Sequence, residues 1–370
     1  MIDSVPHILI SPDKFKGSLT SNQVCAAIEA GIKKYNPEII FTTQPLADGG
    51  EGTLDILKAV LGLEKIAVTV KDALMRSIDT YYLRNEKVAF VEMANASGLL
   101  LLKKEERNPL LTSTYGTGEM IAHALDNGVR EVYLMIGGSA TNDGGIGMAQ
   151  ALGYNFGLGE EVPNGAALSE IRSCDKSNIH PRIKEVKFTV LCDVQNPLIG
   201  EQGAAAVYGP QKGANDAMVR QLDEGLQNLA RVISNGREQN PGAGAAGGLG
   251  YGAISFLNAT LKSGIETVME LTSFSQHLQK ADLVITGEGQ LDAQTLSGKV
   301  IAGVKQQADK VNKPVAVVCG VTRDIEEGNA LGLQHIYQVM SKAESVDDAM
   351  KNAAKYVSDL TTELLHDINF

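Results

Sequence analysis

Short apolar runs alternate along the chain with polar, glycine-rich loops and with segments of helical periodicity. Residues 8–10 predict a strand, and a capping box of Thr20 and Gln23 then predicts the start of a helix. The same order of strand, loop and helix recurs at residues 132–152, where a continuous apolar run is typical of a strand covered on both faces. Alternating strands and helices predict an α/β protein with parallel sheets.

Residues 64–92 break this alternation, because short strand patterns follow one another with only turns between them. Strands of this antiparallel meander are predicted at residues 66–70, 77–83 and 88–91. We therefore expect a doubly wound parallel domain built from both chain ends, residues 1–64 and 285–370. A second α/β domain with a mixed sheet, residues 65–284, would be inserted into it. Further strands are predicted at residues 39–42, 188–192, 283–286, 315–318 and 336–340.

Composition narrows the functional classes. The chain has 44 acidic and 33 basic residues and a net charge of -11, so a main role in binding nucleic acid is disfavoured. It has no tryptophan, and no apolar run approaches the length of a membrane span. The four cysteines form no C-x-x-C pair, which disfavours a structural zinc site. We expect a cytoplasmic protein that binds neither membrane nor nucleic acid.

The predicted strand ends share a chemistry suited to phosphate. In open parallel sheets, ligands bind beyond the carboxyl ends of the strands. Glycine lets the backbone approach a phosphate closely, and a helix N-terminus attracts an anion. Carboxylates hold Mg²⁺ together with phosphate oxygens, and lysine neutralises the transferred group. The candidate side chains and glycines at these ends are Lys14, Lys16, Asp48, Ser139, Thr141, Asn142, Asp143, Asp193, Lys212, Gly287, Glu288, Gly289, Asp292 and Lys299.

Each of these signals has a plain structural alternative, since the same residue types cap helices and form turns. Lys212, taken alone in a tight glycine turn, is more typical of a solvated side chain. Residues 242–252 contain G-x-G-x-x-G, but no strand precedes it, so the dinucleotide fingerprint fails in context. A nucleotide-covering loop or close helix packing remains open for that segment.

Taken together, the motifs identify a resemblance. The matching segments are Pro12-Asp13-Lys14-Phe15-Lys16-Gly17-Ser18-Leu19-Thr20, Pro45-Leu46-Ala47-Asp48-Gly49-Gly50-Glu51-Gly52-Thr53, Gly137-Gly138-Ser139-Ala140-Thr141-Asn142-Asp143-Gly144-Gly145, Gly209-Pro210-Gln211-Lys212-Gly213-Ala214 and Ile285-Thr286-Gly287-Glu288-Gly289 with Asp292 and Gly298-Lys299. The chain closely resembles the type I glycerate kinases of bacteria. Met75 stands where members of that family often have glycine.

The resemblance implies an enzyme that uses ATP and Mg²⁺ to phosphorylate D-glycerate, with 2-phospho-D-glycerate as the usual product. It also implies two α/β domains, one of them flavodoxin-like, with the active site in the cleft between them. The partners would be D-glycerate and ATP, and the chain would be a monomer or a homodimer. The alternatives are a kinase that makes 3-phosphoglycerate, a non-catalytic sugar-acid binding protein, or a glycine-rich α/β fold whose loops only turn.

Within this expectation we assign roles by residue chemistry. Asp193 is the first choice for the catalytic base, and Asp292 is the second. Metal or phosphate-site candidates are Asp48, Asp143 and Glu288. Substrate or phosphate contacts are expected from Lys14, Lys16, Ser139, Thr141, Asn142 and Lys212. Nucleotide contacts are expected from Gly287, Glu288, Gly289 and Lys299.

Overall fold

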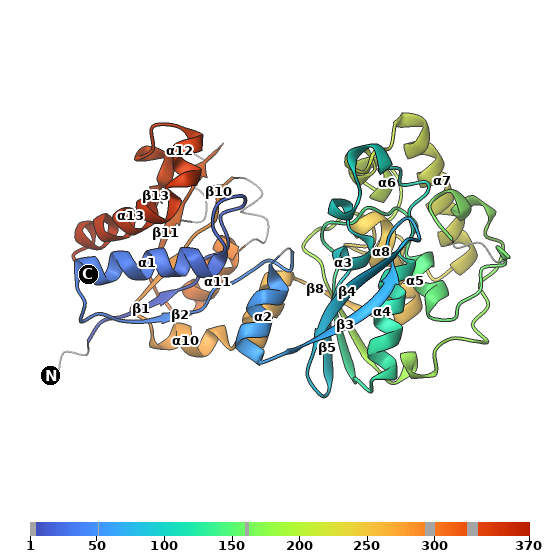
Figure 1. Cartoon of the computed structure of the whole chain (residues 1–370), viewed down its shortest axis with the longest axis horizontal. Coiled ribbons are helices and arrows are strands. Elements are labelled where there is room, and N and C mark those ends of the chain that lie inside the picture. Colours follow the sequence, from blue (N-terminus) through green and yellow to red (C-terminus); the bar gives the residue numbers. More distant parts are fainter. Residues whose placement is uncertain (1–4, 51, 160–162, 293–299, 324–331) are drawn as a thin grey trace. The chain divides into compact units, whose positions relative to one another are not determined.

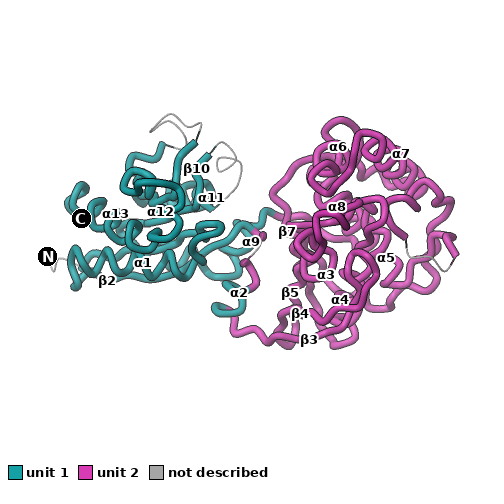
Figure 2. The backbone as a smooth tube through the Cα atoms, turned by 45° about the horizontal axis from the view of Figure 1, so that its top comes forward, with its two compact units in different colours: residues 1–48, 55–60, 263–370 teal, residues 49–54, 61–262 magenta. Residues whose placement is uncertain are grey.

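The structure is a computed structural model that describes residues 5–50, 52–159, 163–292, 300–323 and 332–370. It divides into two compact units (Figure 2). Unit 1 comprises residues 1–48, 55–60 and 263–370, and unit 2 comprises residues 49–54 and 61–262. Residues 263–284, which the sequence assigned to the inserted domain, belong to unit 1, because their last strand pairs with the N-terminal strand.

Unit 1 is built on a five-stranded sheet in the order β13-β11-β9-β1-β2 (Figure 1). Every neighbouring pair in this sheet is parallel. Its strands are β1 (His7–Ile10), β2 (Ile40–Thr43), β9 (Leu283–Thr286), β11 (Val315–Cys319) and β13 (His335–Gln338). The order of these strands along the chain corresponds to the flavodoxin-like sequence 2-1-3-4-5. The predicted doubly wound parallel sheet is therefore confirmed.

Helices cover both faces of this sheet, as a doubly wound fold requires. They are α1 (Ser21–Tyr35), α9 (Gly264–Leu271), α10 (Phe274–Lys280), α11 (Val300–Lys310), α12 (Val346–Lys351) and α13 (Ala353–Asp367), with a 3-10 turn η7 (Val339–Ser341). A small parallel pair joins β10 (Gln290–Leu291) to β12 (Val321–Thr322). Helix α2 (Thr53–Leu61) carries the chain across the boundary between the units.

The start of α1 follows directly from its sequence. The predicted capping box is present, with Gln23 N–H donating to Thr20 Oγ1 at 3.3 Å and Thr20 N–H donating to Gln23 Oε1 at 2.9 Å. Val24 and Ile28 on the inner face of α1 are fully buried in a core that also contains Ile8 and Ile10 of β1. This packing fixes the loop between β1 and α1 at the carboxyl end of the sheet.

Unit 2 is built on a six-stranded mixed sheet in the order β3-β4-β5-β6-β7-β8. Its strands are β3 (Glu64–Lys71), β4 (Ser77–Arg84), β5 (Val88–Glu92), β6 (Glu131–Met135), β7 (Lys187–Leu191) and β8 (Thr260–Lys262). The first three strands pair antiparallel and the remaining pairs are parallel, so the predicted meander and mixed sheet are confirmed. Strand β8 was not predicted, since it has three residues and little apolar pattern.

The remaining elements of unit 2 are helices and 3-10 turns, of which α7 (Asp216–Ile233) is the longest at 18 residues. The α-helices are α3 (Ala94–Ser97), α4 (Tyr115–Asp126), α5 (Ile146–Ala151), α6 (Ala204–Tyr208), α7 (Asp216–Ile233) and α8 (Ala245–Leu257). The 3-10 turns are η1 (Leu99–Leu101), η2 (Lys104–Glu106), η3 (Ala166–Glu170), η4 (Pro181–Lys184) and η5 (Pro210–Lys212). In the described ranges, no helix is both long and apolar enough to cross a bilayer.

The glycine-rich segment of residues 242–252 serves close packing. At the start of α8, Ala246, Gly247 and Gly248 all have left-handed backbone angles. A Cβ at position 247 would clash with the carbonyl oxygen of Thr141, and Gly144 N–H donates to Gly247 O at 3.0 Å. Of the interpretations left open by the sequence, close packing describes this segment, which packs against residues 141–145.

Candidate functional site

A buried lysine organises the loop that follows β6 in unit 2. Lys212 is 2 % exposed, and its ammonium donates to Ser139 Oγ and to the carbonyl oxygen of Thr141, each at 2.6 Å. The turn η5 delivers this side chain, and Gly213 ends the turn with a left-handed φ of 98°. The sequence pattern alone favoured a solvated Lys212. That interpretation is wrong, because a loop from another part of the chain covers the side chain.

Burial changes the acid–base behaviour of this lysine. Loss of hydration lowers the pKa of Lys212 from 10.5 to about 7, and the negative charge of Asp143 opposes the shift. The ammonium therefore binds its proton weakly at neutral pH. An anion placed beside Lys212 would favour the charged form and raise this pKa again. The side chain is suited to bind a carboxylate or phosphate that arrives at the loop.

Asp143 is a buried carboxylate held by hydrogen bonds from its own loop and from Thr114. It is fully buried and accepts hydrogen bonds from Thr114 N and Thr114 Oγ1 at 2.8 Å, from Gly145 N at 3.1 Å and from Gly147 N at 3.3 Å. Burial raises the pKa of Asp143, and the donors counteract that effect. Three of these donors point to Oδ2 and one, Gly145 N–H, points to Oδ1. These contacts let Asp143 fix the geometry of the loop and stabilise the charge of Lys212, and its expected role at a metal or phosphate site stays a prediction.

Polar atoms of the β6 loop lack a partner among the residues that the structure describes. Thr141 Oγ1 and both amide atoms of Asn142 are buried and make no hydrogen bond within the described residues. A buried polar atom without a partner costs about 1–3 kcal/mol, so such atoms usually bind a water or a ligand. Ser139, Thr141 and Asn142 of this loop therefore provide two hydroxyls and an amide, and Lys212 of η5 adds a cation beside them.

Asp193 follows the next strand of the same sheet. Strands β6 and β7 pair in parallel, with Met135 opposite Leu191, so their carboxyl ends share one edge of the sheet. Asp193 follows β7 at that edge and is half-buried. This position is consistent with a general base that acts near the β6 loop. It does not by itself distinguish Asp193 from Asp292.

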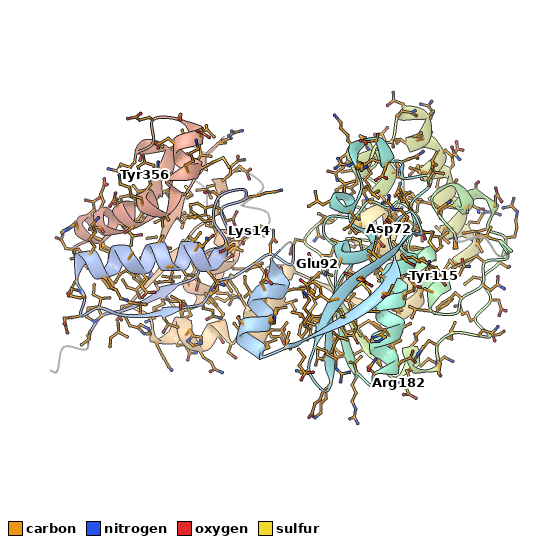
Figure 3. All side chains as sticks on the ribbon, viewed as in Figure 1. Lys14, Asp72, Glu92, Tyr115, Arg182 and Tyr356 are labelled. Carbon is orange, nitrogen blue, oxygen red and sulfur yellow. The ribbon has the colours of Figure 1, made fainter. Side chains whose placement is uncertain are left out.

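The candidate loops of unit 1 meet at the point where strand order reverses, between β1 and β9. Asp13 N–H donates to Gly287 O at 2.8 Å, and a Cβ at position 289 would lie 3.1 Å from Lys16 N. Lys14 lies on the loop before α1, as Figure 3 shows. The structure thus brings the loop containing Lys14 and Lys16 next to residues 287–289.

Glu288 is the buried carboxylate of this group, at 5 % exposure. Its Oε1 accepts a hydrogen bond from Ile301 N–H at 3.2 Å, which places the carboxylate at the N-terminus of α11. Its charge helps to raise the pKa of the neighbouring Cys319 to about 12, after burial as the larger cause. An acidic side chain at this helix end occupies the position where a free helix N-terminus would bind phosphate.

The other acidic candidates of unit 1 are less enclosed. Asp48 is half-buried and follows a segment that runs beside β1, where Gln44 N–H donates to Ile10 O at 2.8 Å. Asp292 accepts a hydrogen bond from Gln290 Nε2 at 2.6 Å. Lys299 lies outside the described residues. Ser11 was not predicted as a site residue, but its buried Oγ at the end of β1 has no partner within the described ranges.

The fold is that of an α/β protein whose candidate anion-binding residues lie in loops at the ends of the strands. A profile of the glycerate kinase family matches residues 8–369. The chain is 46 % identical over 354 residues to a glycerate kinase of Halalkalibacterium halodurans, covering 93 % of each chain. It is 41 % identical to the glycerate 2-kinase of Escherichia coli K12, covering 94 % of this chain and 93 % of that one.

A solved structure gives the same result. The crystal structure of a putative glycerate kinase 2 from Salmonella typhimurium LT2 matches with a TM-score of 0.86 and 38 % identity, covering 99 % of this chain and 98 % of the other. The chain therefore belongs to the glycerate kinase family, and it is an enzyme. The resemblance drawn from its motifs is confirmed.

Proposed function

We propose that the chain transfers the γ-phosphoryl group of ATP to the 2-hydroxyl of D-glycerate, giving 2-phospho-D-glycerate and ADP. The likeness to a glycerate 2-kinase over most of the chain supports the choice of hydroxyl. The single structural observation that carries the proposal is the buried Lys212 ammonium beside unpartnered polar atoms of residues 141 and 142. A three-carbon hydroxy acid offers one carboxylate and two hydroxyls, which match that set of groups.

The acceptor's position is assigned to unit 2. Lys212 binds the glycerate carboxylate, and Thr141 and Asn142 hydrogen-bond its hydroxyls. Asp143, through its four donors, holds the loop in the geometry that these contacts need. Holding the acceptor in one orientation contributes to rate by lowering the entropy cost of bringing the reacting atoms together.

The nucleotide's position is assigned to the strand-order reversal in unit 1. Glycines 287 and 289 allow close backbone approach, and Lys14 and Lys16 supply positive charge for phosphate oxygens. Lys299 is a further phosphate contact on the same proposal. Ser11 Oγ, buried and unpartnered within the described ranges at the end of β1, is available as an additional donor.

The carboxylates of unit 1 suit a Mg²⁺ ion that the phosphates of the nucleotide also help to hold. Within the described ranges, no three His, Cys, Asp or Glu side chains converge to hold a metal on their own. Mg²⁺ at a nucleotide site uses one or two carboxylates together with phosphates and water, and Asp48 and Glu288 are suited to that. When bound there, Mg²⁺ neutralises phosphate charge.

Asp193 is the proposed base that accepts the proton of the reacting hydroxyl, with Asp292 as the alternative. Loss of a general base lowers the rate by about 10²–10⁴. Asp193→Asn should therefore lose at least about a hundredfold in kcat while retaining its thermal unfolding midpoint. If Asp193→Asn keeps its turnover and Asp292→Asn loses it, the base is Asp292.

The reaction itself is tested by incubating the purified chain with Mg-ATP and D-glycerate and recording phosphorus NMR spectra. The proposal predicts a resonance that matches authentic 2-phosphoglycerate, together with stoichiometric ADP. A 3-phosphoglycerate resonance would contradict the regiochemistry alone. Binding of D-glycerate without any phosphorylated product would contradict the kinase proposal and favour a binding protein.

A further inference from the structure

Arg107 begins the segment that borders the β6 loop. It follows the turn η2 (Lys104–Glu106), and its N–H bonds to Lys104 O at 3.4 Å. From there the chain runs beside the loop, with Thr112 Oγ1 donating to Ala140 O at 3.0 Å and Thr114 donating to Asp143. Arg107 therefore enters the same substructure that holds the buried lysine, although no sequence motif marks it.

Arg107 also contacts the turn that carries Lys212. A Cβ at position 213 would clash with the carbonyl oxygen of Arg107 and would lie 3.2 Å from the Cβ of Arg107. The left-handed glycine that ends the turn thus lets the backbones of residues 107 and 213 touch. Lys212 directly precedes Gly213 in the chain. The backbone segments that carry the side chains of Arg107 and Lys212 are therefore in contact.

Within the described residues, one donor of the half-buried Arg107 side chain lacks a partner. Its Nε is buried and donates no hydrogen bond within the described residues. The adjacent acid is already engaged, because Glu106 accepts from Arg76 Nη1 at 2.7 Å and from Lys103 N at 2.9 Å. An arginine is always charged and offers five fixed donors, so a buried unpartnered Nε is costly unless an anion completes it.

We propose that Arg107 is a specificity-determining residue of the acceptor site, and that its guanidinium binds the carboxylate of the three-carbon acid together with Lys212. This inference rests on the proposed function. The planar fork of arginine matches the two oxygens of a carboxylate. The unpartnered atoms of Thr141 and Asn142 then remain for the hydroxyl groups. On this proposal the site prefers a hydroxy acid over a neutral polyol, because only the acid offers a carboxylate to the guanidinium and to Lys212.

The test compares Arg107→Met with Arg220→Met, a matched change at an exposed position of α7. Carboxylate binding contributes equally to the ground state and the transition state, so Arg107→Met should raise KM for D-glycerate about 30- to 1,000-fold with kcat nearly unchanged. Arg107→Lys should recover part of this loss. Arg220→Met should behave as the unmodified protein.

Neutral methyl D-glycerate separates recognition from structure. A recognition role predicts that Arg107→Met loses most of the preference for the acid over the ester, whereas a purely structural role would change both substrates alike. An unchanged preference, with the unmodified protein active, overturns the inference and leaves the proposed function standing. If the unmodified protein shows no turnover, the proposed function fails. In that case, calorimetry compares the affinity of the unmodified protein and of Arg107→Met for D-glycerate. Equal affinities refute the role of Arg107, and so does the absence of binding to either protein.

Discussion

Replacing Lys212 with methionine perturbs the most unusual charge in the described part of unit 2. Burial lowers the pKa of this lysine from 10.5 to about 7. In the unfolded chain the group keeps its ordinary pKa, so between pH 7 and 10.5 the unfolded state binds more protons than the folded one. The free energy of unfolding therefore rises with pH across this range, and this gain is lost as pH falls toward 7. Each pKa unit corresponds to about 1.4 kcal/mol, so the total effect is on the order of 5 kcal/mol.

The assay is urea unfolding of both proteins at pH 7, 8 and 9. The free energy of unfolding of the unmodified protein, measured relative to Lys212→Met, should rise by about 2–3 kcal/mol over those two pH units. Lys184→Met, at an exposed position, serves as the control and should follow the unmodified protein at every pH. Parallel pH profiles for the unmodified protein and Lys212→Met would refute the reasoning, because they would mean that Lys212 has its ordinary pKa in the folded state.

Three further predictions test other parts of the structure. Met75 has a left-handed φ of 66°, so Met75→Gly should stabilise the protein by about 1 kcal/mol, measured by urea unfolding; a loss of stability would contradict this backbone strain. Gly247→Ala should destabilise it by more than about 1 kcal/mol and raise KM for D-glycerate, because the new Cβ clashes with Thr141 O; unchanged stability and KM would argue against the packing role. Asp143→Asn should lower the pH at which D-glycerate binding weakens, since Lys212 loses its buried counter-charge; an unchanged pH profile from calorimetry would count against that role.

Much of the fold could be predicted because its signals are local. The capping box at Thr20 and Gln23 places the start of α1 without reference to the rest of the chain. The apolar run of β6 and the meander of β3 to β5 likewise depend on short patterns. Strand β8 and the unit to which residues 263–284 belong depend on pairing partners far along the chain, and no local pattern encodes them.

The chemistry of the candidate site was predictable only in part. Residue type placed Ser139, Thr141 and Asn142 at a strand end, where ligands bind in this fold. The burial of Lys212 could not be inferred, because Ser139 and Thr141 lie 73 and 71 positions away from it. The same holds for Asp143, whose main donor is Thr114, 29 positions earlier. A carboxylate in a glycine loop has the same sequence signature whether it binds a metal or fixes a neighbouring helix.

The central claim is that the acceptor's carboxylate binds beside the buried ammonium of Lys212. Calorimetric titration of D-glycerate at pH 8, repeated in buffers of different ionisation enthalpy, measures the protons taken up on binding. Because Lys212, with a pKa of about 7, is mostly neutral at pH 8, binding an anion should take up close to one proton per glycerate, and Lys212→Met should take up almost none. Binding without proton uptake, or the same uptake in Lys212→Met, would contradict the account.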